Sequence, residues 1–352
     1  MFEFSVPLSL EQFDYQLPRE RIAQIPATPR DASRLLVSHP QTISDLHFHD
    51  LPSALRPGDL LILNDTRVIA ARLPGRKPTG GQMEVFLLRP TGEPEIWEAL
   101  VGSNKRVVLG SRIIIGPGFE VIIQDRIPTG FRVSLHHPGQ TLETVLERYG
   151  QVPLPPYIDP VAGRGDRERY QTVFARHAGA VAAPTAGLHI TESLFQNLAQ
   201  RGIQWAWTTL HVGLGTFQPL RPEALIEKKL HAEWCHLPTM TVDAIQATQK
   251  KGGRVIAVGT TVARTLESAF IQTGGLLPWE GETNLFIQPG FEFQVVEGII
   301  TNFHLPRSSL LFLVGAFVGL KRLHRDYHHA LAGDYRFYSY GDASLLWPGD
   351  LE

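Results

Sequence analysis

Three histidines follow apolar runs at points where an extended pattern changes to a helical one. His189 lies in APTAGLHITESLF, His211 in TTLHVGLGTF and His304 in TNFHLPRSSLL. An imidazole titrates near neutral pH, so it can accept or donate a proton during a reaction. For one histidine alone, a hydrogen-bonded structural role is the plainer interpretation. Because three histidines occupy corresponding places, we expect them to belong to one functional site.

A fourth junction, RVIAVGTTVARTLES, combines a glycine with two threonines and an arginine. Gly259 allows a close turn, and Thr260 and Thr261 stand where a helix is expected to begin. The free N–H groups and positive dipole end of that helix favour a bound anion, for which Arg264 could supply a bidentate clamp. The alternative is that Thr260 only caps the helix while Arg264 pairs on the surface with Glu267.

These four junctions require an alternation of strands and helices. From residue 178 onward, AVAAP, IQWAWTTLHVG, RVIAVGT and GIITNFHL read as strands, each followed by a helical segment. Repeated strand and helix units indicate a parallel sheet with right-handed crossovers, in which ligands bind at the carboxyl ends of the strands. We therefore predict an α/β domain with its site at that edge.

Residues 66–140 have a different pattern of hydrophobic and turn residues. MEVFLLRP, IWEALVGS, RVVLG, RIIIG, FEVIIQD and GFRVSLHH are short β-branched runs separated by turn residues, as in a small barrel. The stretch holds ten Lys and Arg against six Asp and Glu, whereas the rest of the chain holds 23 against 29. We predict an inserted all-β barrel domain at 66–140 within a discontinuous α/β domain of 1–65 and 141–352, and its basic clusters could contact phosphates.

Further residues at the expected strand ends could bind a substrate. Glycines permit close backbone approach, an aromatic ring can stack, and polar residues at a domain junction often line a cleft. Each also has a plain structural interpretation as a turn, core or capping residue. The additional candidates are Thr185, Gly187, Gly213, Gly215, Phe217, His231, Glu233, Asn302, Asn64 and Arg67.

Composition excludes several classes of protein. Cys235 is the only cysteine, so an intramolecular disulfide and multi-cysteine metal sites are excluded, and KLHAEWCH matches no usual zinc spacing. We expect no metal site. The N-terminus lacks a signal-peptide pattern, and SSLLFLVGAFVGL is too short to cross a bilayer and is expected to form a buried helix. A cytoplasmic protein without membrane contact is expected.

Taken in order, many segments resemble one family over nearly the whole chain. The sequence is similar to the S-adenosylmethionine:tRNA ribosyltransferase-isomerases of queuosine synthesis. The matching segments are NDTRVIAARL, GGQMEVFLL, LPPYI, RYQTVFA, GAVAAPTAGLHIT, TLHVGLGTFQP, HAEW, VIAVGTTVARTLES, TNLFIQPGF, TNFHLPRSSLL and YRFYSYGDASLL. Departures from the family pattern are Leu214, Ile190 and Val262, the last removing one hydroxyl from the expected anion site.

The resemblance implies a reaction and partners. The ribosyl part of S-adenosylmethionine would be transferred and isomerised onto 7-aminomethyl-7-deazaguanine at the wobble position of tRNA with a GUN anticodon, giving epoxyqueuosine-tRNA, adenine and methionine. S-adenosylmethionine would be consumed as a substrate, and no cofactor is expected. For this reaction His189, His211 and His304 are the catalytic candidates, with His189 the first choice as the base. The family fold, an α/β domain with an inserted β-barrel, agrees with the insertion above. A methyltransferase and a non-catalytic tRNA-binding protein remain the rival classes.

Overall fold

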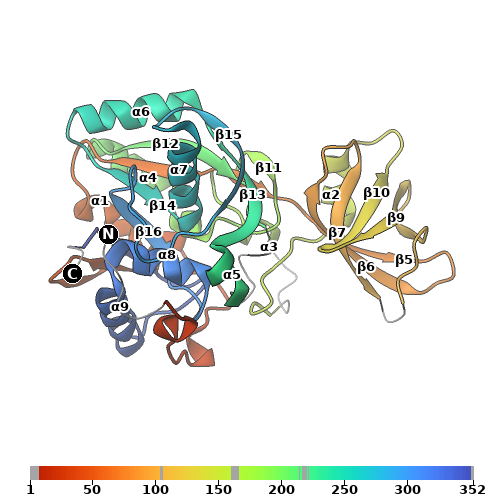
Figure 1. Ribbon diagram of the computed structural model, residues 1–352, viewed down its shortest axis with the longest axis horizontal. Coiled ribbons are helices and arrows are strands. Elements are labelled where there is room, and N and C mark those ends of the chain that lie inside the picture. The colour runs from red at the N-terminus through yellow and green to blue at the C-terminus, as the bar shows by residue number, and fades with distance from the viewer. Residues whose placement is uncertain are drawn as a thin grey trace.

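The computed structural model describes residues 8–103, 106–159, 166–213, 215, 220 and 222–349. It shows a large α/β body at one end and a separate β-barrel at the other (Figure 1). This arrangement confirms the predicted fold class. None of the helices in the described ranges is long and apolar enough to span a membrane.

A nine-stranded mixed sheet forms the centre of the α/β body. Its order is β15-β13-β12-β3-β14-β16-β17-β1-β2. The strands are β1 (Arg34–Ser38), β2 (Ile43–His47), β3 (Leu60–Asn64), β12 (Gln204–Leu210), β13 (Lys229–Leu237), β14 (Val255–Val258), β15 (Trp279–Leu285), β16 (Gly298–Asn302) and β17 (Ala343–Leu346). The central strands β12, β3, β14 and β16 run parallel, so their carboxyl ends meet at one edge. The outer pairs β12–β13, β13–β15, β16–β17 and β1–β2 are antiparallel.

Both faces of this sheet are buried under helices. Along β3, Leu60 and Ile62 face one hydrophobic core, whereas Leu61 and Leu63 face another, as the two-residue period of a strand requires. The first core is completed by α6 (Thr239–Lys250), α7 (Thr260–Thr273), α8 (Ser309–Val318) and α9 (Leu320–Ala332), and the second by α1 (Leu51–Ala54) and α4 (Glu192–Gln200). The expected buried helix in 308–320 is α8.

One expected strand of the alternation is wrong. AVAAP does not join the large sheet: β11 (His177–Ala180) pairs with β4 (Thr66–Val68) in a separate two-stranded sheet, and 181–184 form no strand. Pro184, which has no backbone N–H, ends this extended stretch and precedes the 3-10 helix η6 (Thr185–His189). The strands β13 and β15 were not predicted, because their charged residues mask the alternation of buried side chains.

The barrel closes in the order β10-β7-β6-β5-β8-β9. Its strands are β5 (Arg72–Arg76), β6 (Gln82–Pro90), β7 (Ile96–Ser103), β8 (Arg112–Gly116), β9 (Phe119–Ile127) and β10 (Gly130–His136). Five match predicted runs, but RVVLG forms no strand in its described part, and β5 completes the barrel instead. Helix α2 (Leu142–Tyr149), capped by Thr141, places Val145 and Leu146 in the barrel core. The domain boundaries at residues 66 and 140 stay a prediction.

Three short helices complete the fold near the predicted site and linker. Helices α3 (Asp166–Arg169) and α5 (Pro222–Glu227) lie between the barrel and the sheet in the view of Figure 1, and η4 (Phe48–Asp50) follows β2.

Candidate functional site

The parallel strands deliver residues from distant parts of the chain to one small cavity. This threonine cavity, about 60 Å³ in volume, is lined by Thr185 of η6, Thr260 and Thr261 of α7, and Asn302 and His304 after β16. These five residues were all predicted from the sequence. Those of α7 and β16 meet because the helices and loops after parallel strands begin at the same edge of a sheet. Thr185 joins them because η6, which follows no strand of the large sheet, packs against β16.

The start of α7 gives this cavity an electropositive wall. Gly259 is the N-cap residue and has a φ of 103°, a conformation that L side chains rarely adopt. The backbone therefore turns directly from β14 into α7, and the first N–H groups of a 14-residue helix lie at the cavity. Free N–H groups and the helix dipole favour an anion at such a place.

His304 presents an uncharged imidazole to the cavity. Its Nε2 lies 2.8 Å from Thr301 Oγ1, and its backbone N–H donates to Tyr327 Oη at 2.9 Å. Burial lowers the pKa of His304 to about 3, so the ring is neutral at physiological pH. Among the described residues, the hydrogen bond of the ring is made through Nε2 and none is found for Nδ1. A neutral imidazole with one free nitrogen can exchange a proton with a bound molecule.

Asn302 lies beside His304 and has an unused acceptor. Its Nδ2 faces three acceptors, namely His189 Nε2 at 3.1 Å, the Tyr338 carbonyl at 3.2 Å and the Asp342 carbonyl at 3.5 Å. These contacts fix the orientation of the amide. Its Oδ1 is buried and has no partner within the described part of the chain. A buried acceptor without a donor is costly, so it indicates a place for a ligand N–H or O–H group.

His189 lies behind this wall and is absent from the lining of the threonine cavity. Its Nδ1 is 2.8 Å from Ser33 Oγ, its Nε2 is bonded to Asn302, and its ring stacks on Phe48 with centroids 4.8 Å apart. Burial, with a smaller contribution from Arg336, lowers the pKa of His189 to about 3. Both ring nitrogens are occupied, so the observed geometry suits a residue that positions Asn302.

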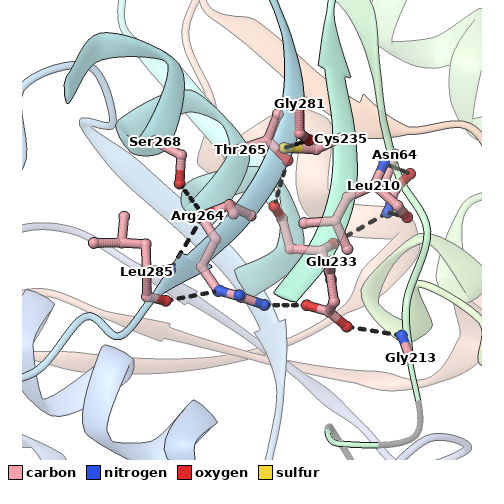
Figure 2. Close-up of polar contacts among 12 residues, drawn as sticks. Asn64, Leu210, Gly213, Glu233, Cys235, Arg264, Thr265, Ser268, Gly281 and Leu285 are labelled. Carbon is pink, nitrogen blue, oxygen red and sulfur yellow. Dashed lines mark hydrogen bonds and ion pairs between the residues drawn. The ribbon is translucent and has the colours of Figure 1, made fainter. Parts of the chain in front are cut away.

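A second and larger hollow adjoins the first. This arginine cavity, about 360 Å³ in volume, is lined by His231, Glu233 and Arg264, among others, and shares Leu310 with the threonine cavity. Figure 2 shows Arg264 and Glu233 pointing toward each other from α7 and β13. Arg264 Nε also donates to the Leu285 carbonyl at 3.1 Å.

One atom of this buried ion pair is left over. Arg264 Nη1 donates a hydrogen bond to Glu233 Oε2. Arg264 Nη2 is also buried, but it has no hydrogen-bond partner within the described ranges. Glu233 Oε1 accepts from the Gly213 N–H at 2.7 Å, which anchors the loop after β12 (Figure 2). The alternative of a surface pair between Arg264 and Glu267 is wrong, because Glu267 accepts instead from the N–H groups of 294–296.

His211 lies outside both cavities. Its Nδ1 is 2.8 Å from Thr66 Oγ1, and its ring stacks on Trp234 with centroids 4.9 Å apart. Burial lowers the pKa of His211 to about 4. Gly179 packs directly against this ring, since an added Cβ would lie 2.5 Å from Nε2. The ring therefore joins the two-stranded sheet to β12 and β13.

Asn64 and Arg67 hold the region where the barrel branches off. Asn64 Nδ2 donates to the Leu210 carbonyl at 3.0 Å and lies 3.4 Å from Thr261 Oγ1, so it ties β3 to β12 and to the start of α7. Arg67 pairs with Glu147 at 2.9 Å and lines a third hollow, at the barrel junction.

Of the predicted glycines, one lines a cavity and the others pack or bond beside the cavities. Gly187 is packed on Phe174, where a Cβ would approach to 2.9 Å, and does not line the threonine cavity. Gly215 lines the arginine cavity against His231, whereas Gly213 is the N–H donor to Glu233. Phe217 lies outside the described residues.

Sequence analysis missed part of the threonine cavity wall. Tyr157 comes from the Pro-rich segment, and Tyr338 and Ser339 come from the aromatic C-terminal segment. Tyr157 Oη lies 2.6 Å from Ser339 Oγ, and its ring packs on Tyr338 with centroids 4.6 Å apart. The unusual composition of LPPYI and YRFYSYGD is a signal that could have marked both segments as candidates. Their contact could not be predicted, because Tyr157 and Ser339 are 182 residues apart in the sequence.

Comparison with known proteins identifies the family. The family model described as queuosine biosynthesis protein matches residues 10–346. The chain is 53% identical over 341 residues to the S-adenosylmethionine:tRNA ribosyltransferase-isomerase of Magnetococcus marinus, covering 96% of this chain and 94% of that protein. The chain belongs to the S-adenosylmethionine:tRNA ribosyltransferase-isomerase family of queuosine biosynthesis.

Other members of this family agree in length and fold. The ribosyltransferase-isomerase of Azoarcus sp. is 50% identical, with 97% of this chain and 99% of that protein covered. The crystal structure of S-adenosylmethionine tRNA ribosyltransferase from Thermotoga maritima is similar with a TM-score of 0.55 and 35% identity, covering 95% of this chain and 99% of that one. The ribosyltransferase-isomerase family therefore accounts for both bodies of the chain, and the chain is an enzyme of that family.

Proposed function

We propose that the two adjoining cavities bind S-adenosylmethionine for ribosyl transfer to tRNA. The acceptor is 7-aminomethyl-7-deazaguanine at the wobble position of a tRNA with a GUN anticodon, and the products are epoxyqueuosine-tRNA, adenine and methionine. Family membership over nearly the full length supports the reaction. The observation that carries the location is the neutral ring of His304 beside the unpaired Asn302 Oδ1.

His304 takes the proton-transfer role in this proposal. A sulfonium makes the adjacent C5′ proton removable, and departing adenine must gain a proton, so one imidazole can serve in turn as base and acid. His304 lines the cavity and has a free nitrogen, whereas His189 is held behind Asn302. His189 is therefore proposed as the residue that positions the amide, in place of the base expected from the sequence.

Helix α7 offers two places for the polar end of S-adenosylmethionine. Its first turn, with the hydroxyls of Thr260 and Thr261, would hold the methionine carboxylate. One turn further, the unpaired Arg264 Nη2 would donate to a second acceptor in the arginine cavity, beside His231 and Glu233. A charge-assisted hydrogen bond of this kind is among the stronger contacts available to a substrate.

Partner and location complete the proposal. The barrel segment 66–140 carries more basic than acidic residues, which suits contact with a polyanion such as tRNA. A cytoplasmic location follows from the proposed tRNA substrate, which is modified there.

The decisive experiment is incubation with S-adenosylmethionine and tRNA that carries the aminomethyl precursor. Chromatography should show free adenine and methionine, and the digested tRNA should contain the epoxyqueuosine nucleoside. S-adenosylhomocysteine in place of adenine would show a methyltransferase, and tRNA binding with no base released would show a non-catalytic binding protein.

Variants of the two buried histidines test the assignment of roles. We expect His304→Gln to lower the single-turnover rate by about a hundredfold to ten-thousandfold, the usual value of general acid–base catalysis. S-adenosylmethionine affinity should stay within about tenfold, because a proton-transfer group is lost and not a main binding contact. His189→Gln should affect the rate less. A His304→Gln enzyme with normal turnover would rule out the proposed role.

A further inference from the structure

A cluster of metal-binding side chains lies at the far edge of the large sheet. His47 ends β2, and His49 and Asp50 belong to η4 directly after it. One ligand atom from each residue lies within 4.8 Å of the other two, and no other group of three such residues is found in the described part of the chain. Both histidines are exposed, so an ion could reach them.

Local contacts already hold the three side chains close together. The imidazole rings of His47 and His49 lie parallel, with centroids 5.3 Å apart and an interplanar angle of 1°. Asp50 Oδ2 accepts from the His47 backbone N–H at 3.0 Å, and Asp50 Oδ1 lies 3.7 Å from His49 Nε2. A carboxylate that is fixed by a backbone hydrogen bond loses little freedom when it also binds a metal.

The chemistry of the donor set selects the class of ion. Two imidazoles and one carboxylate are the ligands that Zn²⁺ prefers, with a water in the fourth position, whereas Mg²⁺ and Ca²⁺ prefer oxygen ligands only. Bonds of about 2.0 Å place ligand atoms roughly 3.3 Å apart around a tetrahedral ion. The lone pair of an imidazole nitrogen lies in the plane of its ring, so the parallel rings must rotate for both nitrogens to face one ion. Both side chains are exposed, which leaves this rotation open to them.

The positive charge nearest along the strand pair is already neutralised. Arg34 is opposite His47 in the β1–β2 pairing. Its guanidinium pairs with Asp45 at 3.6 Å, donates to the Gly333 carbonyl and lies over the Tyr335 ring. It therefore does not repel a cation at the cluster as an unpaired arginine would.

The cluster surrounds a residue that supports the proposed site. Phe48, between the two histidines, is buried and stacks on the His189 ring. Its N–H donates to the Ser33 carbonyl at 2.8 Å, and Ser33 Oγ contacts His189 Nδ1. An ion bound by His47 and His49, the residues before and after Phe48 in the chain, would restrain the segment that packs against His189.

We propose that His47, His49 and Asp50 form a surface site for Zn²⁺ or a similar divalent transition ion, which stabilises the segment around Phe48. The proposal does not depend on the reaction above. The ion would serve a structural role, because none of the three ligands lines the threonine cavity.

The test is calorimetric titration of the full, chelator-treated chain with Zn²⁺, together with the visible spectrum of bound Co²⁺. We expect one ion per cluster, and we expect His49→Ala and Asp50→Asn each to raise Kd by about tenfold or more. Asn keeps the acceptor for the His47 N–H. Zn²⁺ should also slow amide exchange at residues 48–50.

A matched control removes a competing pair of histidines. His324 and His328 are exposed one turn apart on α9 and could bind an ion with two ligands. His324→Ala should leave Kd unchanged. The proposal is overturned if His324→Ala abolishes binding, if His49→Ala leaves Kd unchanged, or if no saturable binding occurs below about 1 mM.

Discussion

Two histidines with similar environments differ at the level of single atoms. His189 and His304 are both buried and both uncharged, yet His189 uses its two ring nitrogens for Ser33 and Asn302. His304 uses one nitrogen for Thr301 and lines the threonine cavity. The hydrogen-bond partners of each ring, and not its pKa, distinguish a positioning role from a chemical one.

The low pKa of His189 should make stability depend on pH. The unfolded ring titrates near pH 6.5 and the folded ring near 3, so between these values the unfolded chain binds the extra proton and stability falls as pH falls. The contribution is fully present above pH 6.5. We expect His189→Gln to reduce the slope of unfolding free energy against pH by up to about 1.4 kcal/mol per pH unit between pH 6 and 4.

Urea unfolding of both proteins at several pH values measures this slope. The pKa values of His304 and His211 are lowered too, so they contribute to the slope in the same direction. The dependence of unfolding free energy on pH should therefore be steeper in the wild type than in His189→Gln, but it should not disappear in the variant. Identical slopes for wild type and His189→Gln would show that folding does not lower the pKa of the His189 ring.

At the scale of elements, α7 connects the two cavities. Its first turn lines the threonine cavity and Arg264, one turn later, lines the arginine cavity. Such a position requires the chain to turn from β14 into the helix within one residue, Gly259. With φ of 103° and ψ of 149°, Gly259 occupies a region of backbone conformation that is essentially restricted to glycine.

Gly259→Ala should therefore destabilise the chain by about 1–3 kcal/mol through backbone strain. A clash is not the cause, because the nearest atom to an added Cβ would be Thr261 Oγ1 at 3.4 Å. Gly275→Ala is the control: it lies just beyond the other end of α7 and its Cβ would meet nothing within 4 Å. Equal unfolding midpoints for the two variants in urea would contradict the strain argument.

At the scale of the whole molecule, the barrel and the α/β body have separate hydrophobic cores. No residue is shared between the barrel core around Leu87 and the sheet core around Leu60. Figure 1 shows the barrel set apart from the sheet and joined to it by connecting segments of the chain. Few buried contacts across a junction permit the two parts to unfold separately.

Scanning calorimetry should resolve two transitions. Leu87→Ala and Leu60→Ala each empty a buried leucine site and should each cost about 2–5 kcal/mol. We expect each variant to lower one transition temperature and to leave the other nearly unchanged. A single transition shifted equally by both variants would show that the two cores unfold together.

Local pattern and topology rules were sufficient to predict much of this protein. Apolar runs and capping residues predicted α7, α8 and the parallel strands, and β-branched runs predicted the barrel. The same rules predicted that Thr260, Asn302 and His304 would meet, because the carboxyl ends of parallel strands share one edge. These features depend on neighbours in sequence or on a general property of sheets.

Only the tertiary structure decided which side chain faces which group. Ser33 and His189 are 156 residues apart, and Glu233 and Arg264 come from different elements, so no local pattern reports their contacts. The end of a strand determines where a residue lies, but its partners come from segments that are distant in the sequence. For that reason the sequence predicted that these residues lie near one edge of the sheet, whereas only packing across the domain places His304 in the lining of the threonine cavity and His189 outside it.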